Sequence, residues 1–80
     1  MKKEEKTLSP ETLEELSICY TQSEIVKNPY SGNEILLDPV AVAVYDYLKG
    51  CEMFNDWEGL AQARNWFIDN RPKAYFVLID

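Results

Sequence analysis

Two pairs of residues, Ser9-Pro10 and Asp38-Pro39, set where helices of this chain begin. In each pair, a side chain that can accept hydrogen bonds from free backbone amides stands directly before a proline. Proline suits the first position of a helix because its φ angle is already helical and the amide hydrogen it lacks has no partner there. Apolar residues at helical spacing follow both pairs. We therefore predict a first helix over residues 10–21 and a second helix that begins at residue 39.

A third helix is predicted after the second. The second helix extends to Met53, although Gly50 weakens its last turns. Asn55 or Asp56 can cap the next helix, which we expect to end at Asp69. Arg64 interrupts its apolar stripe and is expected to reach outward or to pair with a carboxylate such as that of Asp46. The helix is expected to be buried on more than one side. The residues expected on one side are Trp57, Leu60, Ala61, Arg64, Phe67 and Ile68, with Ala63 and Trp66 on another.

A dense run of turn-forming residues, Asn28-Pro29-Tyr30-Ser31-Gly32, separates two short apolar segments. Pro29 fixes φ at a turn position, and Gly32 supplies a site for a positive φ. The flanking segments EIVK and EILL have the pattern of short strands. The pattern predicts a hairpin-like insertion over residues 23–38, which must pack on the helices because an isolated hairpin is unstable in water. An irregular Ω-loop is the alternative.

The closing segment, residues 72–80, fits two structures. Pro72 can open a short helix, whereas the run AYFVLI has the intrinsic preference of a strand. We favour the helix because the sequence offers no long strand to pair with this segment. The predicted fold is therefore mainly α, with three to four helices and a small β-hairpin or Ω-loop in one compact domain over residues 9–80. Residues 1–8 are predicted to form a flexible charged arm.

The chain is short and acidic. Its 80 residues carry 14 acidic and 8 basic side chains, which gives a net charge of -6. This charge repels a phosphate backbone, so we expect no direct nucleic-acid binding, whereas a basic protein surface would be attracted. The longest apolar runs have six residues, and a membrane span needs about 20. With no apolar segment after the N-terminal lysines, we expect neither a signal peptide nor membrane association.

Catalytic chemistry has few candidates in this sequence. It contains no histidine, which removes histidine zinc ligands, histidine general bases and the Ser-His-Asp triad. No glycine-rich phosphate loop and no carboxylate cluster with metal-binding spacing is present. Cys19 and Cys51 lack CxxC spacing, and we expect two buried, reduced thiols. We therefore predict no catalytic residues, no metal and no cofactor.

Protein-binding chemistry has more candidates. Ten residues are aromatic, and most of those after residue 44 are expected to fill the core. Tyr45 and Tyr47 lie about 200° apart on a helix, so they face different ways. Tyr30 at a loop tip and Trp57 are candidate anchors, because Tyr and Trp dominate interface hot spots. The acidic residues expected to supply charge to a partner-binding surface are Glu11, Glu14, Glu15, Asp46, Glu52, Asp56 and Glu58.

Three segments carry a wider pattern: the turn NPYSG, the apolar run EILLDPVAVAVYDYLKG, and the ending ARNWFIDNRPKAYFVLID. In these segments the chain resembles small proteins of tailed bacteriophages and of bacteria that carry their prophages. The resemblance begins near Val26, covers about two-thirds of the chain and does not include the first helix. The resemblance implies no catalytic residue in this chain. It implies a phage accessory gene product expressed in the bacterial cytosol.

These observations lead to three functional hypotheses. The first is a non-enzymatic phage accessory protein that binds a host or phage protein through an acidic and aromatic surface, for instance to inhibit a nucleic-acid-handling or host-defence protein. The second is a self-associating structural or assembly protein, such as a homodimer or a virion component. It is motivated by the small core of an 80-residue chain and by its apolar ending. The third is a small regulatory or antitoxin-like domain.

Overall fold

Helices dominate the structure, a computed structural model that describes residues 7–79. A two-stranded antiparallel sheet follows the first helix, and the last helix continues into a π-helical turn. The fold class predicted from the sequence, mainly α with a small hairpin, is therefore confirmed. The elements in chain order are α1 (Pro10–Ser17), β1 (Glu24–Lys27), β2 (Glu34–Leu37), α2 (Pro39–Met53), α3 (Trp57–Asn70), α4 (Pro72–Ala74) and the π-helical turn η1 (Tyr75–Ile79).

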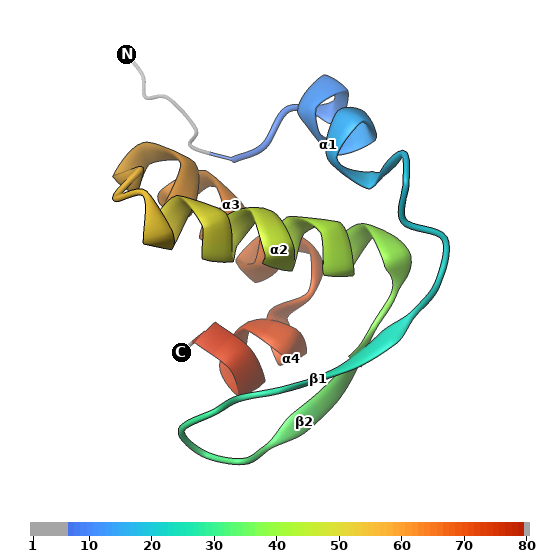
Figure 1. Cartoon of the computed structure of the whole chain (residues 1–80), viewed down its shortest axis with the longest axis vertical. Helices are drawn as coiled ribbons and strands as arrows, with labels where there is room; N and C mark the ends of the chain where they lie inside the picture. The colour runs from blue at the N-terminus through green and yellow to red at the C-terminus, as the bar shows by residue number, and fades with distance from the viewer. Residues whose placement is uncertain (1–6, 80) are drawn as a thin grey trace.

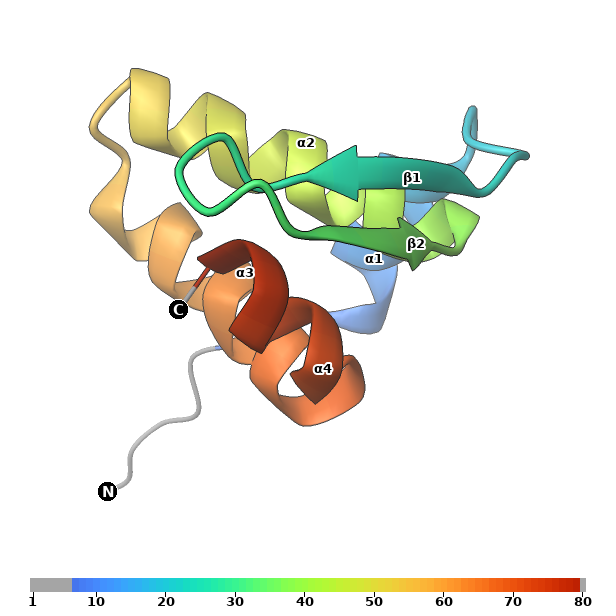
Figure 2. The ribbon, with the colours of Figure 1, turned by 90° about the horizontal axis from the view of Figure 1, so that it is seen from below.

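Helix α2 runs through the middle of the molecule, and α1, α3 and β2 all contact it. α1 lies along its upper side, while the closing α4–η1 segment lies beneath it, next to the hairpin (Figure 1). From below, the hairpin crosses one face of α2 and the closing segment packs against α3 (Figure 2). The hairpin is thus held between α2 and the end of the chain.

Helix α1 begins as the sequence predicts and ends earlier. The Ser9 hydroxyl accepts a hydrogen bond from the Thr12 amide at 3.2 Å, and Pro10 takes the first helical position. The helix stops at Ser17, so the predicted extension to residue 21 is wrong. The chain turns there because the Tyr20 amide donates to the Ser17 carbonyl at 2.9 Å. This turn brings the Tyr20 hydroxyl to within 2.9 Å of the Asp46 carboxylate on α2.

Leu8 belongs to the core, which corrects part of the predicted arm. Its side chain is 5% exposed and packs in the central apolar cluster. Leu8 precedes the helix cap and Leu13 occupies the fourth helical position, which are the two positions of a hydrophobic staple. Thr7 is half-buried, and residues 1–6 of the predicted arm lie outside the described residues. The core therefore begins before the first helix does.

The insertion over residues 23–38 is a hairpin, so the Ω-loop alternative is wrong. Glu24 pairs with Leu37 and Lys27 with Glu34 in an antiparallel register. The turn closes through the Asn28 amide, which donates to the Asn33 carbonyl at 2.8 Å. Gly32 has a φ of +81°, the left-handed conformation for which glycine is suited. The positive φ predicted for Gly32 is therefore confirmed.

Asp38 does not cap α2 through its side chain, contrary to the prediction from Asp38-Pro39. The helix still begins at Pro39, and the Val42 amide donates to the Asp38 backbone carbonyl at 2.9 Å. The carboxylate instead binds the Arg71 guanidinium, with distances of 2.8 Å to Nε and 3.0 Å to Nη2. A two-pronged contact with a full positive charge is stronger than a bond from a single amide, and it ties the start of α2 to the end of α3.

Helix α3 buries Phe67, Ala63 and Trp66 as predicted, but two residues of the predicted stripe are exposed. Trp57 is 61% exposed and Ile68 is 41% exposed, although the sequence pattern predicts both on the buried side. The buried residues are Gly59, Ala63, Trp66 and Phe67, which lie one or two helical turns apart and so share a face. Trp66 and Phe67 meet edge to face, with ring centroids 5.2 Å apart. Trp57 is the first residue of α3 and does not pack against the core cluster.

The closing segment is helical, so the helix predicted for it is confirmed and the alternative strand is wrong. Pro72–Ala74 is α-helical and Tyr75–Ile79 continues as a π-helix. Leu78 is 8% exposed and joins the core, whereas Phe76 points outward. The segment contacts α3 and β2 and so closes the lower side of the core. The largest fully buried side chains of that core are Phe67, Leu37 and Val44.

Candidate partner-binding surface and pocket

Residues 52–58, where α2 turns into α3, form an unbroken run of exposed side chains, which we call the corner surface. Three of them are large and apolar: Met53, Phe54 and Trp57. Glu52, Asp56 and Glu58 are interspersed among them. Single exposed apolar residues are ordinary on a protein surface, but three large ones within five residues concentrate apolar surface at this corner. The corner surface therefore combines aromatic and acidic side chains.

Backbone hydrogen bonds hold the corner surface in place. The Phe54 amide donates to the Gly50 carbonyl at 3.1 Å, and the Asp56 amide donates to the Cys51 carbonyl at 2.8 Å. Asn55 has a φ of +59°, a left-handed conformation that asparagine tolerates better than most residues. The Asp56 side chain then caps α3 by accepting from the Gly59 amide at 3.1 Å, so Asp56 is the cap among the two candidates, Asn55 and Asp56, that the sequence offered. The reversal between the two helices is thus hydrogen-bonded throughout.

A thiol and a phenol pack beneath the corner surface. The Cys51 thiol lies 3.8 Å from the Asp56 carboxylate, and Tyr47 borders the same small cavity of about 280 Å³. Burial raises the pKa of the Cys51 thiol and also that of Tyr47. Both groups therefore stay protonated at neutral pH, and Cys51 is not an activated nucleophile. Cys19 is exposed, so the prediction of two buried thiols holds for Cys51 and is wrong for Cys19.

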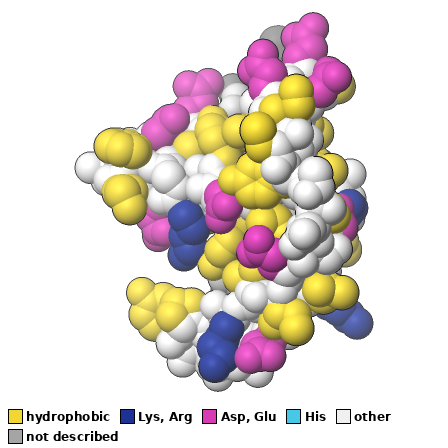
Figure 3. All heavy atoms as spheres, turned by 45° about the vertical axis from the view of Figure 1, so that its right-hand side comes forward, with side chains coloured by type: hydrophobic (Ala, Val, Ile, Leu, Met, Phe, Trp, Pro, Cys, Tyr) yellow, Lys and Arg dark blue, Asp and Glu magenta, His cyan; other side chains and the backbone are white. Residues whose placement is uncertain are grey.

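The structure does not unite the acidic residues that the sequence predicted as one surface. Glu52, Asp56 and Glu58 lie at the corner with Trp57. The Asp46 carboxylate accepts a hydrogen bond from the Tyr20 hydroxyl, and this bond raises the pKa of Tyr20. Acidic side chains also gather over α1, at the top of the molecule in the space-filling view (Figure 3). The acidic residues of that helix are Glu11, Glu14 and Glu15, and they lie away from the corner (Figure 1).

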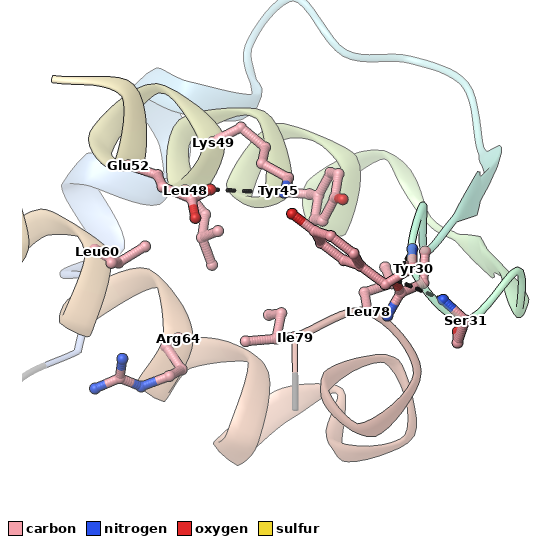
Figure 4. Close-up of a pocket in the computed structure, with 11 residues that line it drawn as sticks. Tyr30, Ser31, Tyr45, Leu48, Lys49, Glu52, Leu60, Arg64, Leu78 and Ile79 are labelled. Carbon is pink, nitrogen blue, oxygen red and sulfur yellow. Dashed lines mark hydrogen bonds and ion pairs between the residues drawn. The ribbon is translucent and has the colours of Figure 1, made fainter. Parts of the chain in front are cut away.

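Tyr30 lies beside a different feature, a pocket of about 400 Å³ between the hairpin loop, α2, α3 and the end of the chain. We call it the tyrosine pocket, because Tyr30 and Tyr45 both line it. Tyr45 and Tyr47 thus face different cavities, as their spacing predicts. Figure 4 shows Tyr30 reaching from the loop toward Tyr45. The other residues that line the tyrosine pocket are Asn28, Ser31, Leu48, Lys49, Glu52, Leu60, Arg64, Leu78 and Ile79.

The loop that carries Tyr30 is fixed by one side chain. The Asn28 carboxamide oxygen accepts from the amides of Tyr30, at 2.8 Å, and Ser31, at 3.3 Å. Its nitrogen donates to the Val77 carbonyl at 2.9 Å. Tyr30 itself is 96% exposed, which agrees with its predicted place at a loop tip. The phenol therefore stands at the rim of the pocket on an anchored loop.

Two cations line the tyrosine pocket. The Lys49 ammonium lies 3.6 Å from the Glu52 carboxylate and 5.5 Å from the centre of the Tyr45 ring. Arg64 makes no ion pair with any acidic side chain among residues 7–79. Asp46, named from the sequence as a partner for Arg64, instead accepts from Tyr20. Sequence reasoning missed this pocket, since its walls come from four separate segments.

Comparisons with protein-family models, with curated protein sequences and with solved structures give no match. Over residues 7–79, no group of three Cys, Asp or Glu side chains is arranged to hold a metal ion. No helix in that part of the chain is long and apolar enough to cross a membrane.

Proposed function

We propose that this chain is a non-enzymatic protein-binding module and that the corner surface is its contact site. The observation that carries the proposal is the exposure of Met53, Phe54 and Trp57, at 76%, 79% and 61%, within seven consecutive residues. Removing such side chains from water favours association, and large aromatic residues contribute most of the binding energy at protein interfaces. None of the three belongs to the apolar core of the described residues.

Charge defines the kind of partner. Glu52, Asp56 and Glu58 border the apolar residues, and the whole chain has a net charge of -6. An acidic surface attracts a basic one and speeds their encounter, and this effect weakens as salt screens the charges. We therefore propose a partner protein whose binding surface is basic at its edge and apolar at its centre.

The resemblance to small phage proteins suggests the biological setting. In that setting the module is a phage accessory protein in the bacterial cytosol, and its partner is a host or phage protein. Proteins that handle nucleic acids have basic grooves that fit the proposed surface, because they bind phosphate backbones. We propose inhibition of such a protein, or of a host-defence protein with the same kind of groove, as the biological outcome.

The proposal is tested by affinity capture with matched variants. Tagged wild-type protein, the double variant Phe54→Ala/Trp57→Ala and the control Phe76→Ala are each incubated with bacterial lysate at low and high salt. Phe76 is 66% exposed and lies outside the corner surface, so the control also removes an exposed aromatic ring. We expect a protein that is retained by the wild type and the control at low salt, and lost with the double variant.

The captured protein is then purified and its affinity measured directly. We expect the double variant to bind at least about tenfold more weakly, since loss of a hot-spot residue costs about 2 kcal/mol or more. The corner-surface proposal fails if Phe76→Ala weakens binding as much as the double variant does. It also fails if no protein is retained at either salt concentration.

A second function, self-association, is favoured by a different observation. Ile25 and Leu36 stand directly opposite each other on the outer face of the hairpin and are 67% and 65% exposed. A short sheet with open edges and an apolar outer face can pair with a second copy. Sedimentation at high micromolar concentration decides between the two functions. A dimer that Ile25→Lys dissociates supports assembly, whereas a strict monomer contradicts it.

A further inference from the structure

The tyrosine pocket has the size and the walls of a small-molecule site. Its volume of about 400 Å³ falls within the range of about 300–1,000 Å³ that is usual for ligand pockets. Leu48 and Leu78 are buried core residues that reach its wall, and Leu60 and Ile79 add further apolar surface. In the close-up these four side chains border the cavity: Leu60 lies on the side away from the tyrosines, whereas Leu78 lies beside Tyr30 (Figure 4). The wall therefore suits the apolar body of a ligand.

The charges at the pocket differ from those of the rest of the molecule. Residues 7–79 contain five basic side chains, and two of them, Lys49 and Arg64, line this one pocket. Glu52 neutralises Lys49, from which it lies 3.6 Å away. Among the described residues, no acidic side chain forms an ion pair with Arg64. The Arg64 side chain lines the pocket, and its guanidinium points outward at the edge on the side away from the tyrosines (Figure 4), where it can bind a carboxylate through two parallel hydrogen bonds.

The Tyr30 ring lies at the mouth of the pocket on a loop that hydrogen bonds anchor. Tyr30 extends from the loop toward Tyr45 (Figure 4), and its loop is tied to the Val77 carbonyl by Asn28. Because Tyr30 is 96% exposed, its ring has room to settle on a ligand that fills the cavity. An aromatic ring held near an apolar wall favours a ligand with a flat or branched apolar body.

We propose that the tyrosine pocket binds a small organic anion with one carboxylate on a compact apolar body. The carboxylate pairs with Arg64 at the edge of the pocket, while Lys49 stays with Glu52. The body lies against Leu48, Leu60 and Ile79, and Tyr30 covers it. This site is separate from the corner surface, although Glu52 borders both.

The test uses three probes of the same shape and different charge. Phenylacetate, phenylacetamide and phenethylammonium are titrated into the isotope-labelled wild-type protein, and backbone amide shifts are followed by NMR. We expect phenylacetate to cause saturable shifts at Tyr30, Leu48 and Ile79, with a dissociation constant of about 1 mM or lower, as suits a ligand of its size. We expect the neutral amide to bind at least about fivefold more weakly, and the cation to cause no saturable shift, because only the anion can pair with Arg64.

Two charge variants make the test specific. Arg64→Gln and the control Lys73→Gln each remove one positive charge, and Lys73 is an exposed residue outside the pocket. We expect Arg64→Gln to weaken phenylacetate binding about tenfold, and Lys73→Gln to leave it within about twofold, since the loss of a paired charge costs more than a change in net charge. The unliganded NMR spectrum of each variant shows whether it is folded.

Several outcomes would overturn the proposal. They are the absence of saturable shifts with phenylacetate, equal binding of the cation, and equal weakening by the two charge variants. The double variant Phe54→Ala/Trp57→Ala is titrated in parallel and is expected to bind phenylacetate as the wild type does. Failure of the tyrosine pocket is thereby distinguished from failure of the corner surface.

Discussion

The side-chain amide of Asn28 donates to the main-chain carbonyl of Val77, 49 positions later in the chain, at 2.9 Å. The last carbonyls of a helix lack partners within the helix, so this bond satisfies one of them. The same carboxamide also accepts from the amides of Tyr30 and Ser31. One side chain therefore shapes the hairpin turn and fastens it to the closing segment.

Replacing Asn28 with alanine is expected to lower the free energy of unfolding by about 2–3 kcal/mol, because three hydrogen bonds worth about 1 kcal/mol each are lost. Urea unfolding followed by circular dichroism measures this change. Asn70→Ala is the control, since the Asn70 amide makes a local bond to the Trp66 carbonyl one turn back. Its cost is expected to stay below about 1 kcal/mol. Equal costs for the two variants would contradict the role assigned to Asn28.

The Asp38–Arg71 pair predicts a pH dependence of stability. The hydrogen bond from Arg71 holds the pKa of the Asp38 carboxyl below its usual range. The stabilisation is therefore complete above the ordinary carboxyl pKa of about 4, and is lost as the pH falls through the lower value in the folded protein. Because both side chains are more than a third exposed, the pair is worth at most about 1 kcal/mol.

Urea unfolding between pH 7 and pH 2 checks this prediction. Asp38→Asn is expected to be less stable than the wild type at pH 7, and the gap is expected to close toward pH 2, where Asp38 is protonated. A gap that stays constant over this range would show that the ion pair is not its source.

Two glycines in helices predict opposite effects of the same substitution. A Cβ at Gly59 would lie 2.7 Å from the Cys51 sulfur, 2.8 Å from Asp56 Oδ2 and 2.9 Å from Tyr47 Oη. Gly59→Ala is therefore expected to destabilise the fold by about 1–3 kcal/mol, the usual cost of overpacking. A Cβ at Gly50 would meet no neighbouring atom within 4 Å, so Gly50→Ala is expected to stabilise α2 by up to about 1 kcal/mol. Thermal unfolding of the two variants decides, and a gain in stability for Gly59→Ala would refute the close packing.

The two cysteines are expected to react at very different rates. Cys19 is exposed, whereas Cys51 is buried and burial raises its pKa, so little thiolate is available at Cys51. Ellman's reagent at pH 8 is expected to modify one thiol rapidly and the second only after denaturation. Cys19→Ser should abolish the fast phase and Cys51→Ser should leave it intact. A fast phase that survives in Cys19→Ser would contradict the burial of Cys51.

Local sequence signals predicted much of the fold, because they act within a few residues. Ser9 caps its helix, Asp56 caps α3, and the Pro29–Gly32 region turns the hairpin. The Asp38 side chain departs from this rule because a distant partner, Arg71, outcompetes the local amides. Nothing near Asp38 in the sequence reveals that partner.

The candidate sites were harder to predict than the fold. Tyr30 and Trp57 were recognised as candidate anchors, yet the sequence placed Trp57 on a buried stripe as well. The helical period says which residues share a face, but it does not say where the neighbouring helix ends. Lys49 and Arg64 line one pocket through the packing of α2 on α3, and the spacing of residues along the sequence does not predict such long-range placement.

The hydrogen-bonded reversal between α2 and α3 has a consequence for kinetics. Asn55 and its neighbours are already ordered in the unbound protein by bonds to the carbonyls of Glu52, Gly50 and Cys51. The conformational entropy of that segment is therefore lost during folding and not again during association. For the proposed partner complex, such preorganisation favours fast association, and the fit of Phe54 and Trp57 then sets the lifetime of the complex.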